Sequence, residues 1–209
     1  MANVKRSAGS DWREGFLFLG NHLALDFLNT RPVQNGEPHE LLPDFNAVLR
    51  WFRAASLLSS HQVDDLRRQW GESVRGREMT AALHELREKL RHEIIAWEDT
   101  GKLHRGFSDV LNQIMAEHPM LTRLNRNTNE VMTELWFEAR RPEDLFAPLA
   151  YAVALLFSSV DRSRVRKCGH CVLHFYDTSK KGTRRWCSMQ LCGNRLKVAA
   201  YAVRQRAHK

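Results

Sequence analysis

Apolar side chains recur every three or four residues along much of the chain, which is the spacing of helices that bury one face. The clearest run predicts one long helix. Its buried face would consist of Leu83, Leu86, Leu90, Ile94 and Trp97. Gly101 is placed to end this helix, because glycine readily takes the left-handed backbone conformation found after a helix C-terminus.

Shorter runs of the same period predict three more helices. Asp44 would cap the first, Ser60 would cap a second that stops at Gly71, and Ser108 would cap a third that Pro119 closes. Short polar side chains suit these positions because they accept hydrogen bonds from the first backbone amides of a helix. The apolar positions of the first and third runs are Phe45, Val48, Leu49, Phe52, Leu111, Ile114 and Met115.

Other segments predict strands. Residues 16–30 (FLFLGNHLALDFLNT) fit a strand followed by a short helix, and Asn35 with Gly36 is a typical turn of a β-hairpin. Residues 121–139 alternate between apolar and polar side chains around the turn-forming run NRNTNE and predict a second hairpin.

The most apolar stretch, residues 146–160 (FAPLAYAVALLFSSV), predicts a buried core helix preceded by Pro142, Glu143 and Asp144. Its 15 residues fall short of the roughly 20 that cross a membrane. The first residues, MANVKRSAGSDWREG, lack the apolar core of a signal peptide. We therefore expect a cytoplasmic protein without a membrane partner.

The charged residues are distributed unevenly along the chain. Residues 162–209 hold 13 Lys and Arg against a single acid, Asp177, for a net charge of +12, whereas residues 1–161 hold 19 basic and 23 acidic residues, for a net charge of −4. Such asymmetry favours a polyanionic partner for the basic part, either nucleic acid or an acidic membrane surface.

The four cysteines, Cys168, Cys171, Cys187 and Cys192, share this basic segment with the spacing C-x2-C, 15 residues, C-x4-C. Two residues between ligands let one tight turn present two sulfurs to one ion, and disulfides are uncommon in a reducing compartment. Four thiolates make a closed tetrahedral site without an open position for substrate. We therefore predict one structural Zn²⁺ per chain.

The sequence around the cysteines predicts a treble-clef-like zinc finger. Residues 172–177 (VLHFYD) and 184–187 (RRWC) would pair as strands across the turn SKKGT, and a basic helix would carry the last ligand in its first turn. The expected class is α+β and mainly α: residues 1–161 form a helical domain with one or two β-hairpins, and residues 162–209 form the finger. The predicted boundary is the polar run DRSRVRK at 161–167.

Basic side chains of the finger could approach a nucleic acid or form an ordinary solvated face; the charge of this segment favours the first interpretation. The predicted contacts are Lys180, Lys181, Arg184, Arg185, Arg195, Lys197, Arg204 and Arg206.

Four other side chains of the finger invite a functional interpretation. His170 and His174 could ligate metal, but four thiolates already complete the site, so we expect both beside it or on the surface. Trp186 is expected in the small core of the module rather than as a base-stacking platform. Asp177 is expected to pair with an arginine or cap a turn rather than to catalyse a reaction.

The finger resembles the CGNR zinc finger family, named for residues 192–195. The resemblance includes YDTS at 176–179, RRWCSM at 184–189 and Lys197. The preceding region resembles the ABATE domain, most visibly in GNHLALDFLNT at 20–30. The resemblance implies a stress-associated bacterial transcription regulator whose finger binds DNA.

The leading hypothesis is therefore a regulator that binds duplex DNA, with an N-terminal domain that senses a small-molecule effector or forms a homodimer. Asp26 and Asn29 would line a ligand pocket, or they form a turn and cap pair. The alternative is an RNA-binding or protein-interaction adaptor with a structural zinc module. We do not expect an enzyme, because no nucleophile with its base, P-loop or dinucleotide fingerprint is present, and His22 near Asp26 is an isolated pair.

Overall fold

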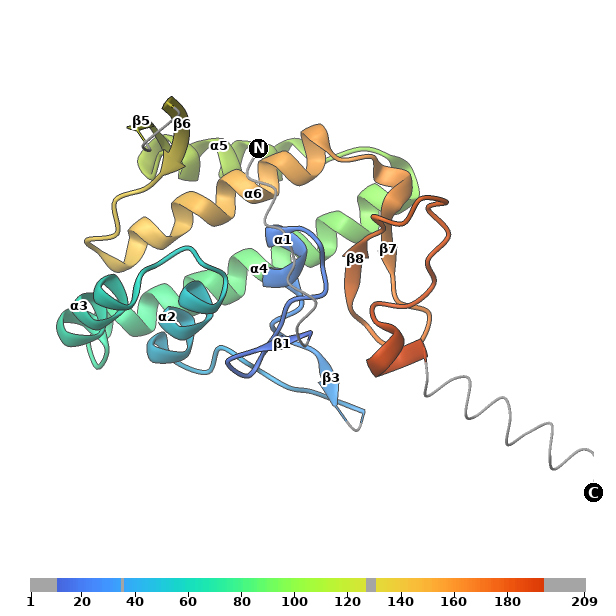
Figure 1. The fold of residues 1–209 in the computed structure, drawn as a ribbon, viewed down its shortest axis with the longest axis horizontal. Helices are drawn as coiled ribbons and strands as arrows, with labels where there is room; N and C mark the ends of the chain where they lie inside the picture. Colours follow the sequence, from blue (N-terminus) through green and yellow to red (C-terminus); the bar gives the residue numbers. More distant parts are fainter. Residues whose placement is uncertain (1–10, 35, 127–130, 194–209) are drawn as a thin grey trace, which may run out of the picture.

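A computed structural model describes residues 11–34, 36–126 and 131–193 of this chain. Its α-helices are α1 (Leu23–Leu28), α2 (Phe45–Ala54), α3 (Ser60–Trp70), α4 (Val74–Thr100), α5 (Arg105–Glu117) and α6 (Phe146–Ser159). The strands form antiparallel two-stranded hairpins: β1 (Trp12–Arg13) with β2 (Phe16–Leu17), β3 (Val33–Gln34) with β4 (Glu37–Pro38), β5 (Leu121–Arg126) with β6 (Val131–Trp136), and β7 (Val165–Lys167) with β8 (His174–Tyr176). Figure 1 shows a mainly helical body with small hairpins, which confirms the predicted α+β class.

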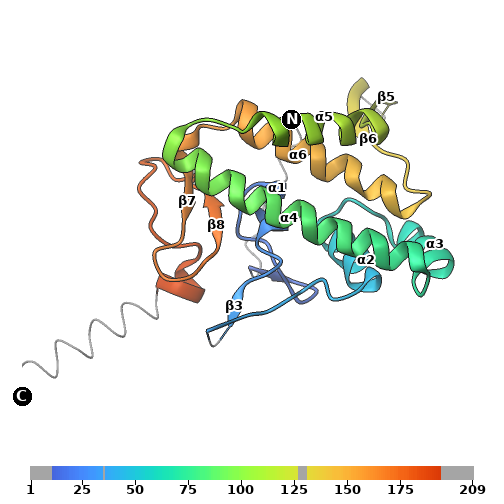
Figure 2. The same cartoon turned by 180° about the vertical axis from the view of Figure 1, so that it is seen from behind.

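The short helix α1 lies at the centre of the molecule, where it contacts α4, α6 and β8. Ala24, Leu25, Phe27 and Leu28 are completely buried. A helix of this length has almost no stability of its own in water, so its conformation depends on the elements packed around it. Seen from behind in Figure 2, α4 crosses the molecule in front of α1.

The long helix α4 confirms the clearest expectation from the hydrophobic pattern. All five predicted apolar positions of its inner face are buried. The Ser73 side chain accepts a hydrogen bond from the Gly76 amide at the start, and Gly101 takes a left-handed conformation (φ 70°) at the end. The predicted cap of α2 is also confirmed, because the Asp44 carboxylate accepts from the Ala47 amide at 2.7 Å.

Two predicted helix starts are wrong. Helix α3 is capped by Ser59 rather than Ser60, because Ser59 and Gln62 bind each other's backbone amides in a reciprocal capping box. Helix α5 begins at Arg105, before the predicted cap Ser108, whose hydroxyl donates instead to the Arg105 carbonyl.

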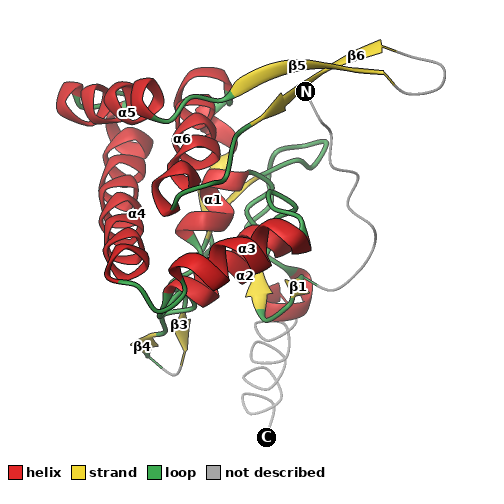
Figure 3. Cartoon of the chain, turned by 90° about the vertical axis from the view of Figure 1, so that its left-hand side faces the viewer, coloured by secondary structure: helices red, strands yellow, loops and turns green. Residues whose placement is uncertain are grey.

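The two predicted hairpins are present. Asn35 itself lies outside the described residues, but Gly36 has a φ of 89°, the positive value that such a turn requires. Strands β5 and β6 form a long hairpin that extends away from the helices in Figure 3. The hairpin of β1 and β2 was not predicted, because two-residue strands are too short to show an alternating pattern.

Pro142 begins a 3-10 turn, Pro142–Leu145, that leads directly into the predicted core helix α6. Seven of its side chains are buried: Ala147, Pro148, Leu149, Ala150, Ala152, Val153 and Leu156. Among the residues that the structure describes, no helix combines the length and the apolar character needed to cross a membrane.

The buried apolar side chains form two clusters. The larger fills the helical body and includes Val165 of β7. The smaller surrounds the cysteines with Leu173 and Phe175 of the finger, and Leu17 and Leu19 from the beginning of the chain complete it. The finger therefore shares its core with the body, and the run 161–167, predicted as a boundary, contains β7.

Candidate metal centre and its attachment to the helical body

The first cysteine pair lies in the turn of the β7–β8 hairpin. Lys167 pairs with His174, and the Cys168 amide donates to the Leu173 carbonyl at 2.8 Å, which closes the C-x2-C turn. The predicted pairing of residues 172–177 with 184–187 is wrong, because β8 pairs with the segment directly before the turn. Residues 184–187 form no strand.

The second pair is held by a turn that Ser188 organises. Cys187 precedes Ser188, and Cys192 lies in a single π-helical turn, Met189–Gly193. The Ser188 hydroxyl accepts hydrogen bonds from the Gln190 and Leu191 amides and donates one to the Asp11 carboxylate. The backbone carbonyl of Ser188 accepts a hydrogen bond from the Cys192 amide at 3.1 Å. The rest of the predicted C-terminal helix lies outside the described residues.

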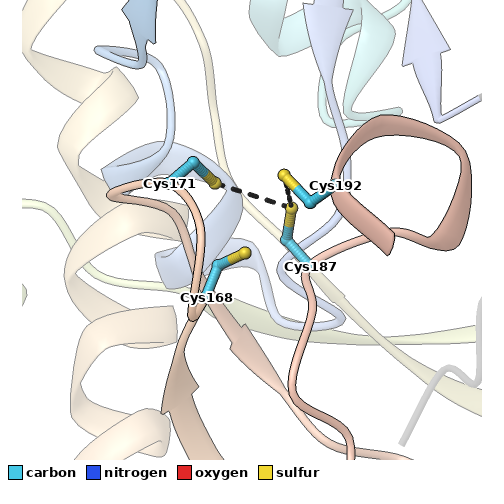
Figure 4. A group of neighbouring side chains, drawn as sticks. All are labelled: Cys168, Cys171, Cys187 and Cys192. Carbon is cyan, nitrogen blue, oxygen red and sulfur yellow. Dashed lines mark hydrogen bonds between the residues drawn. The ribbon is translucent and has the colours of Figure 1, made fainter. Parts of the chain in front are cut away.

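The four sulfur atoms converge as predicted (Figure 4). All lie within 4.8 Å of one another, and Cys187 Sγ is 3.7 Å from Cys171 Sγ and 3.5 Å from Cys192 Sγ. Tetrahedral coordination with Zn–S bonds of about 2.3 Å places ligand sulfurs about 3.8 Å apart. Cys168, Cys187 and Cys192 are buried and Cys171 is partly buried. This donor set and spacing fit one structural zinc ion.

Four thiols this close cannot all ionise without a cation. Hydrogen bonds from Cys171 and Cys187 lower the pKa of Cys168. The hydrogen bond to Cys168 raises the pKa of Cys171 to about 12, and hydrogen bonds with Cys168 and Cys171, followed by burial, raise the pKa of Cys187. A dication supplies the missing charge, so metal binding here releases protons.

Asp177 performs the structural roles expected of it. It is fully buried, and its carboxylate accepts hydrogen bonds from the Ser179 amide at 2.9 Å and the Arg184 amide at 2.8 Å, with Arg166 Nε 3.8 Å away. Burial opposes ionisation, but the hydrogen bonds outweigh it and lower the pKa of Asp177. The only acid of the basic segment therefore shapes the loop after β8.

Arg184, a predicted nucleic-acid contact, is turned into the finger. Its Nε donates to the Trp186 carbonyl at 2.8 Å, its Nη2 donates to the Cys187 carbonyl, and its guanidinium lies 4.8 Å above the Phe175 ring. These contacts stabilise the backbone at residues 186 and 187 and so position the Cys187 side chain. Trp186 packs against the small core, as predicted.

Other predicted contacts face solvent. Lys180, Lys181 and Arg185 are exposed, and none of them has a carboxylate partner among the described residues. Arg195, Lys197, Arg204 and Arg206 lie outside the described residues. Among the histidines, His170 is exposed, whereas His174 is buried with its Nε2 3.8 Å from Glu98 on α4.

The loop and helix at residues 20–30 hold strand β8 of the finger. Asn29 binds His174 twice: its Nδ2 donates to the His174 carbonyl at 2.8 Å, and its Oδ1 accepts from the His174 amide at 3.0 Å. The Tyr176 amide donates to the Gly20 carbonyl at 2.7 Å, and Asn21 Nδ2 donates to the Tyr176 carbonyl at 2.8 Å. We call Gly20, Asn21 and Asn29 the finger socket.

Two arginines of helix α4 donate hydrogen bonds to the end of the segment at residues 20–30. Arg91 donates to the Leu28 carbonyl at 3.1 Å, and the buried Arg87 donates to the Thr30 hydroxyl at 2.7 Å while pairing with Glu40. Both contacts fix the C-terminal end of α1. The segment that carries the socket therefore connects helix α4 of the body to strand β8, which follows the first cysteine pair.

The position of Asp26 and Asn29 agrees with the turn and cap interpretation. Asn29 is the C-cap residue of α1, and the Asp26 carboxylate accepts from the Gly20 amide at 2.6 Å. A small molecule at these side chains would have to replace existing hydrogen bonds, so a ligand pocket there stays a prediction. His22 is the N-cap of α1, and burial lowers its pKa to about 4, consistent with a structural role for the neutral ring.

Gly20 allows α1 to approach the loop that precedes it. A β-carbon at this position would lie 2.7 Å from both the Asp26 amide nitrogen and the Leu25 β-carbon, closer than packed atoms permit. Gly20→Ala should therefore lower the free energy of unfolding by about 1–3 kcal/mol. Urea unfolding measures this change. Gly106→Ala is the matched control, because nothing lies within 4 Å of its added β-carbon. Equal stabilities of the two variants would contradict the close contact.

The sequence did not reveal the socket as a contact surface. Asn29 lies 145 positions and Asn21 lies 155 positions from its partner on β8. The available signal was a six-residue apolar helix flanked by glycine and asparagine, which is typical of a buried helix whose ends must satisfy backbone groups elsewhere.

Two family models match the chain. The ABATE model, described as "Putative stress-induced transcription regulator", matches residues 21–160, and the CGNR zinc finger model matches residues 164–205. The socket residues Asn21 and Asn29 thus fall in the first match and the cysteines in the second. Neither description is that of an enzyme. No curated protein matches the chain.

Proposed function

Because this chain belongs to the ABATE family and carries a CGNR zinc finger, we propose that it regulates transcription by binding duplex DNA through the finger. The zinc ion fixes the cysteine turns, and exposed basic side chains contact phosphates. The ion has no catalytic role in this proposal, because four thiolates complete its coordination.

The main support for DNA binding is the charge on the surface of the finger. Asp177, the single acid of residues 162–209, is fully buried, bonded to backbone amides and paired with Arg166, so it leaves Lys180, Lys181 and Arg185 without a carboxylate partner. Lys180, Lys181 and Arg185 project from the same module into solvent. A surface with cations and no exposed carboxylate attracts a polyanion over several ångströms.

We expect the affinity for DNA to fall steeply with salt. If about six phosphates are contacted, the logarithm of the association constant should change with the logarithm of the salt concentration at a slope of about −5. Fluorescence anisotropy of a labelled 30-base-pair duplex, titrated with zinc-loaded full-length protein at several salt concentrations, measures this slope.

A nearly flat salt dependence would overturn the proposal. A single-stranded RNA and a hairpin RNA of equal length serve as competitors in the same assay. Stronger competition by either RNA than by unlabelled duplex would favour the RNA-binding alternative over DNA.

Three further elements belong to this proposal. The division into a sensing domain at 1–161 and a finger at 162–209, the small-molecule effector and the homodimer all stay predictions. A dimer would help because a single finger module typically covers only about 600–1,000 Å² of DNA-facing surface. Light scattering at micromolar concentration tests it directly.

A further inference from the structure

A basic cleft lies where the finger meets the C-terminal end of α4. Its volume is about 500 Å³. Arg162, Arg166, Lys167 and Arg185 line it, together with one acid, Glu98, and with Arg184, whose guanidinium already binds the Trp186 and Cys187 carbonyls. Three of these cations belong to the run at 161–167 that the sequence indicated as a boundary. The cleft thus joins Arg184 and Arg185, which were predicted as nucleic-acid contacts, to cations of this run, to which the sequence assigned no contact.

The backbone holds two of the cations in position. Arg162 donates to the carbonyls of Trp97 and Glu98 at 3.1 and 2.9 Å, so its guanidinium is fixed at the end of α4. Arg166 donates through Nη2 to the Gly182 carbonyl at 2.7 Å. Fixed guanidinium groups lose little conformational freedom when they bind an anion.

The other two cations are available. Lys167 and Arg185 are exposed, and neither has an ion pair with a carboxylate in the part of the chain that the structure describes. Arg185 lies over the Trp186 ring at 5.1 Å, which orients its guanidinium without neutralising it.

Buried polar atoms without hydrogen-bond partners lie in or beside the cleft. Among the described residues, two that line the cleft hold such an atom: Arg166 Nε, which lies 3.8 Å from the Asp177 carboxylate, and Glu98 Oε1, which lies 3.8 Å from another such atom, His174 Nε2. Buried polar atoms almost always have a partner, supplied by protein, water or ligand. An oxyanion in the cleft would add a second negative charge beside the Arg166 guanidinium, whose pairing with Asp177 is long at 3.8 Å.

We propose that this cleft binds a phosphate group, held by Arg162, Arg166, Lys167 and Arg185. The source we favour, a phosphodiester of bound DNA, rests on the proposed function. Arg185 belongs both to the cleft and to the exposed finger surface, so one duplex could contact both. A free phosphorylated small molecule carries the same chemistry.

Glu98 makes phosphate binding depend on pH. Burial, with a smaller contribution from Asp99, raises its pKa to about 7, while Lys167 opposes the shift. Below this value the carboxyl is neutral and can donate a hydrogen bond; above it the carboxylate repels an anion. The neighbouring His174 remains neutral from pH 6 to 8, because burial lowers its pKa to about 4. Binding should therefore be stronger at pH 6 than at pH 8.

Two substitutions with opposite effects test the proposal in the zinc-loaded full chain. Lys167→Gln should lower the affinity for a labelled duplex by about 3–10-fold and reduce the salt slope by about 0.9. Glu98→Gln should raise the affinity several-fold at pH 8 and leave it unchanged at pH 6. Arg126→Gln is the matched charge control, because Arg126 lies on the β5–β6 hairpin, at the opposite end of the body from the finger in Figure 1.

Inorganic pyrophosphate, titrated by calorimetry into the wild-type protein and Lys167→Gln, distinguishes the two sources of phosphate. Loss of duplex affinity in Lys167→Gln supports the cleft with DNA as the source. Unchanged duplex affinity with loss of pyrophosphate binding supports the cleft with a free ligand.

If the wild-type protein binds duplex steeply with salt but neither substitution alters binding of either probe, the cleft proposal is wrong and the proposed function stands. If the wild-type protein binds no duplex, the proposed function fails, and the pyrophosphate titration still decides the cleft.

Discussion

Replacing Cys187 with serine should remove zinc from the protein and unfold the finger. Cys187 is fully buried, and its sulfur lies within 3.7 Å of Cys171 and Cys192, at the centre of the thiolate group that would hold the ion. Substitutions that only perturb the partners of metal ligands lower metal affinity by about 10–100-fold. Loss of a ligand should therefore cost more than about 100-fold.

The finger should unfold because its own core is too small to stay folded without metal. Among the described residues of the finger, Leu173 and Phe175 are the only further buried apolar side chains in the cluster around the cysteines. Modules of this size typically depend on a metal or disulfides. The helical body should remain folded, since its larger core is formed by α1 to α6.

Zinc content by mass spectrometry, together with far-ultraviolet circular dichroism, measures both effects in Cys187→Ser. His170→Ala is the control, because His170 is exposed beside the cysteines and its loss should leave one zinc per chain. A Cys187→Ser protein that keeps its zinc would contradict the four-thiolate site. Duplex binding should disappear with the metal if the finger presents the contacts.

Features specified by neighbouring residues were predictable from the sequence. The inner face of α4 follows from its three- and four-residue spacing, and Gly101 ends the helix because of a local backbone requirement. The metal site follows from the cysteine spacing alone, since each pair is brought together within one turn.

Two features of the finger were not predictable, because the local sequence pattern does not indicate them. Strand β7 pairs with β8, yet Val165–Lys167 is too short and too basic to show the alternation of a strand. Arg184 stays a predicted nucleic-acid contact, but the sequence did not indicate that two backbone carbonyls and the Phe175 ring also bind its half-buried side chain. A count of charges cannot distinguish a bound guanidinium from a free one.

Asn29→Ala should loosen the finger from the body while leaving the zinc in place. The substitution removes both hydrogen bonds to His174 and leaves its buried amide and carbonyl without partners. Each such group costs about 1–3 kcal/mol, so the free energy of unfolding should fall by about 2–6 kcal/mol. For a chain of this size that lowers Tm by roughly 5–20 °C. Zinc should be retained, because all four ligands lie in the finger.

Differential scanning calorimetry and zinc content test this expectation together. Asn112→Ala is the control, because Asn112 is exposed on α5 and its substitution should change Tm by less than about 2 °C. Limited proteolysis adds a local measurement: cleavage between residues 160 and 170 should accelerate in Asn29→Ala, since β7 and β8 lose their anchor on α1. An unchanged Tm with unchanged cleavage would mean that the finger is held by its apolar contacts with Leu17 and Leu19, and that the socket contributes only orientation.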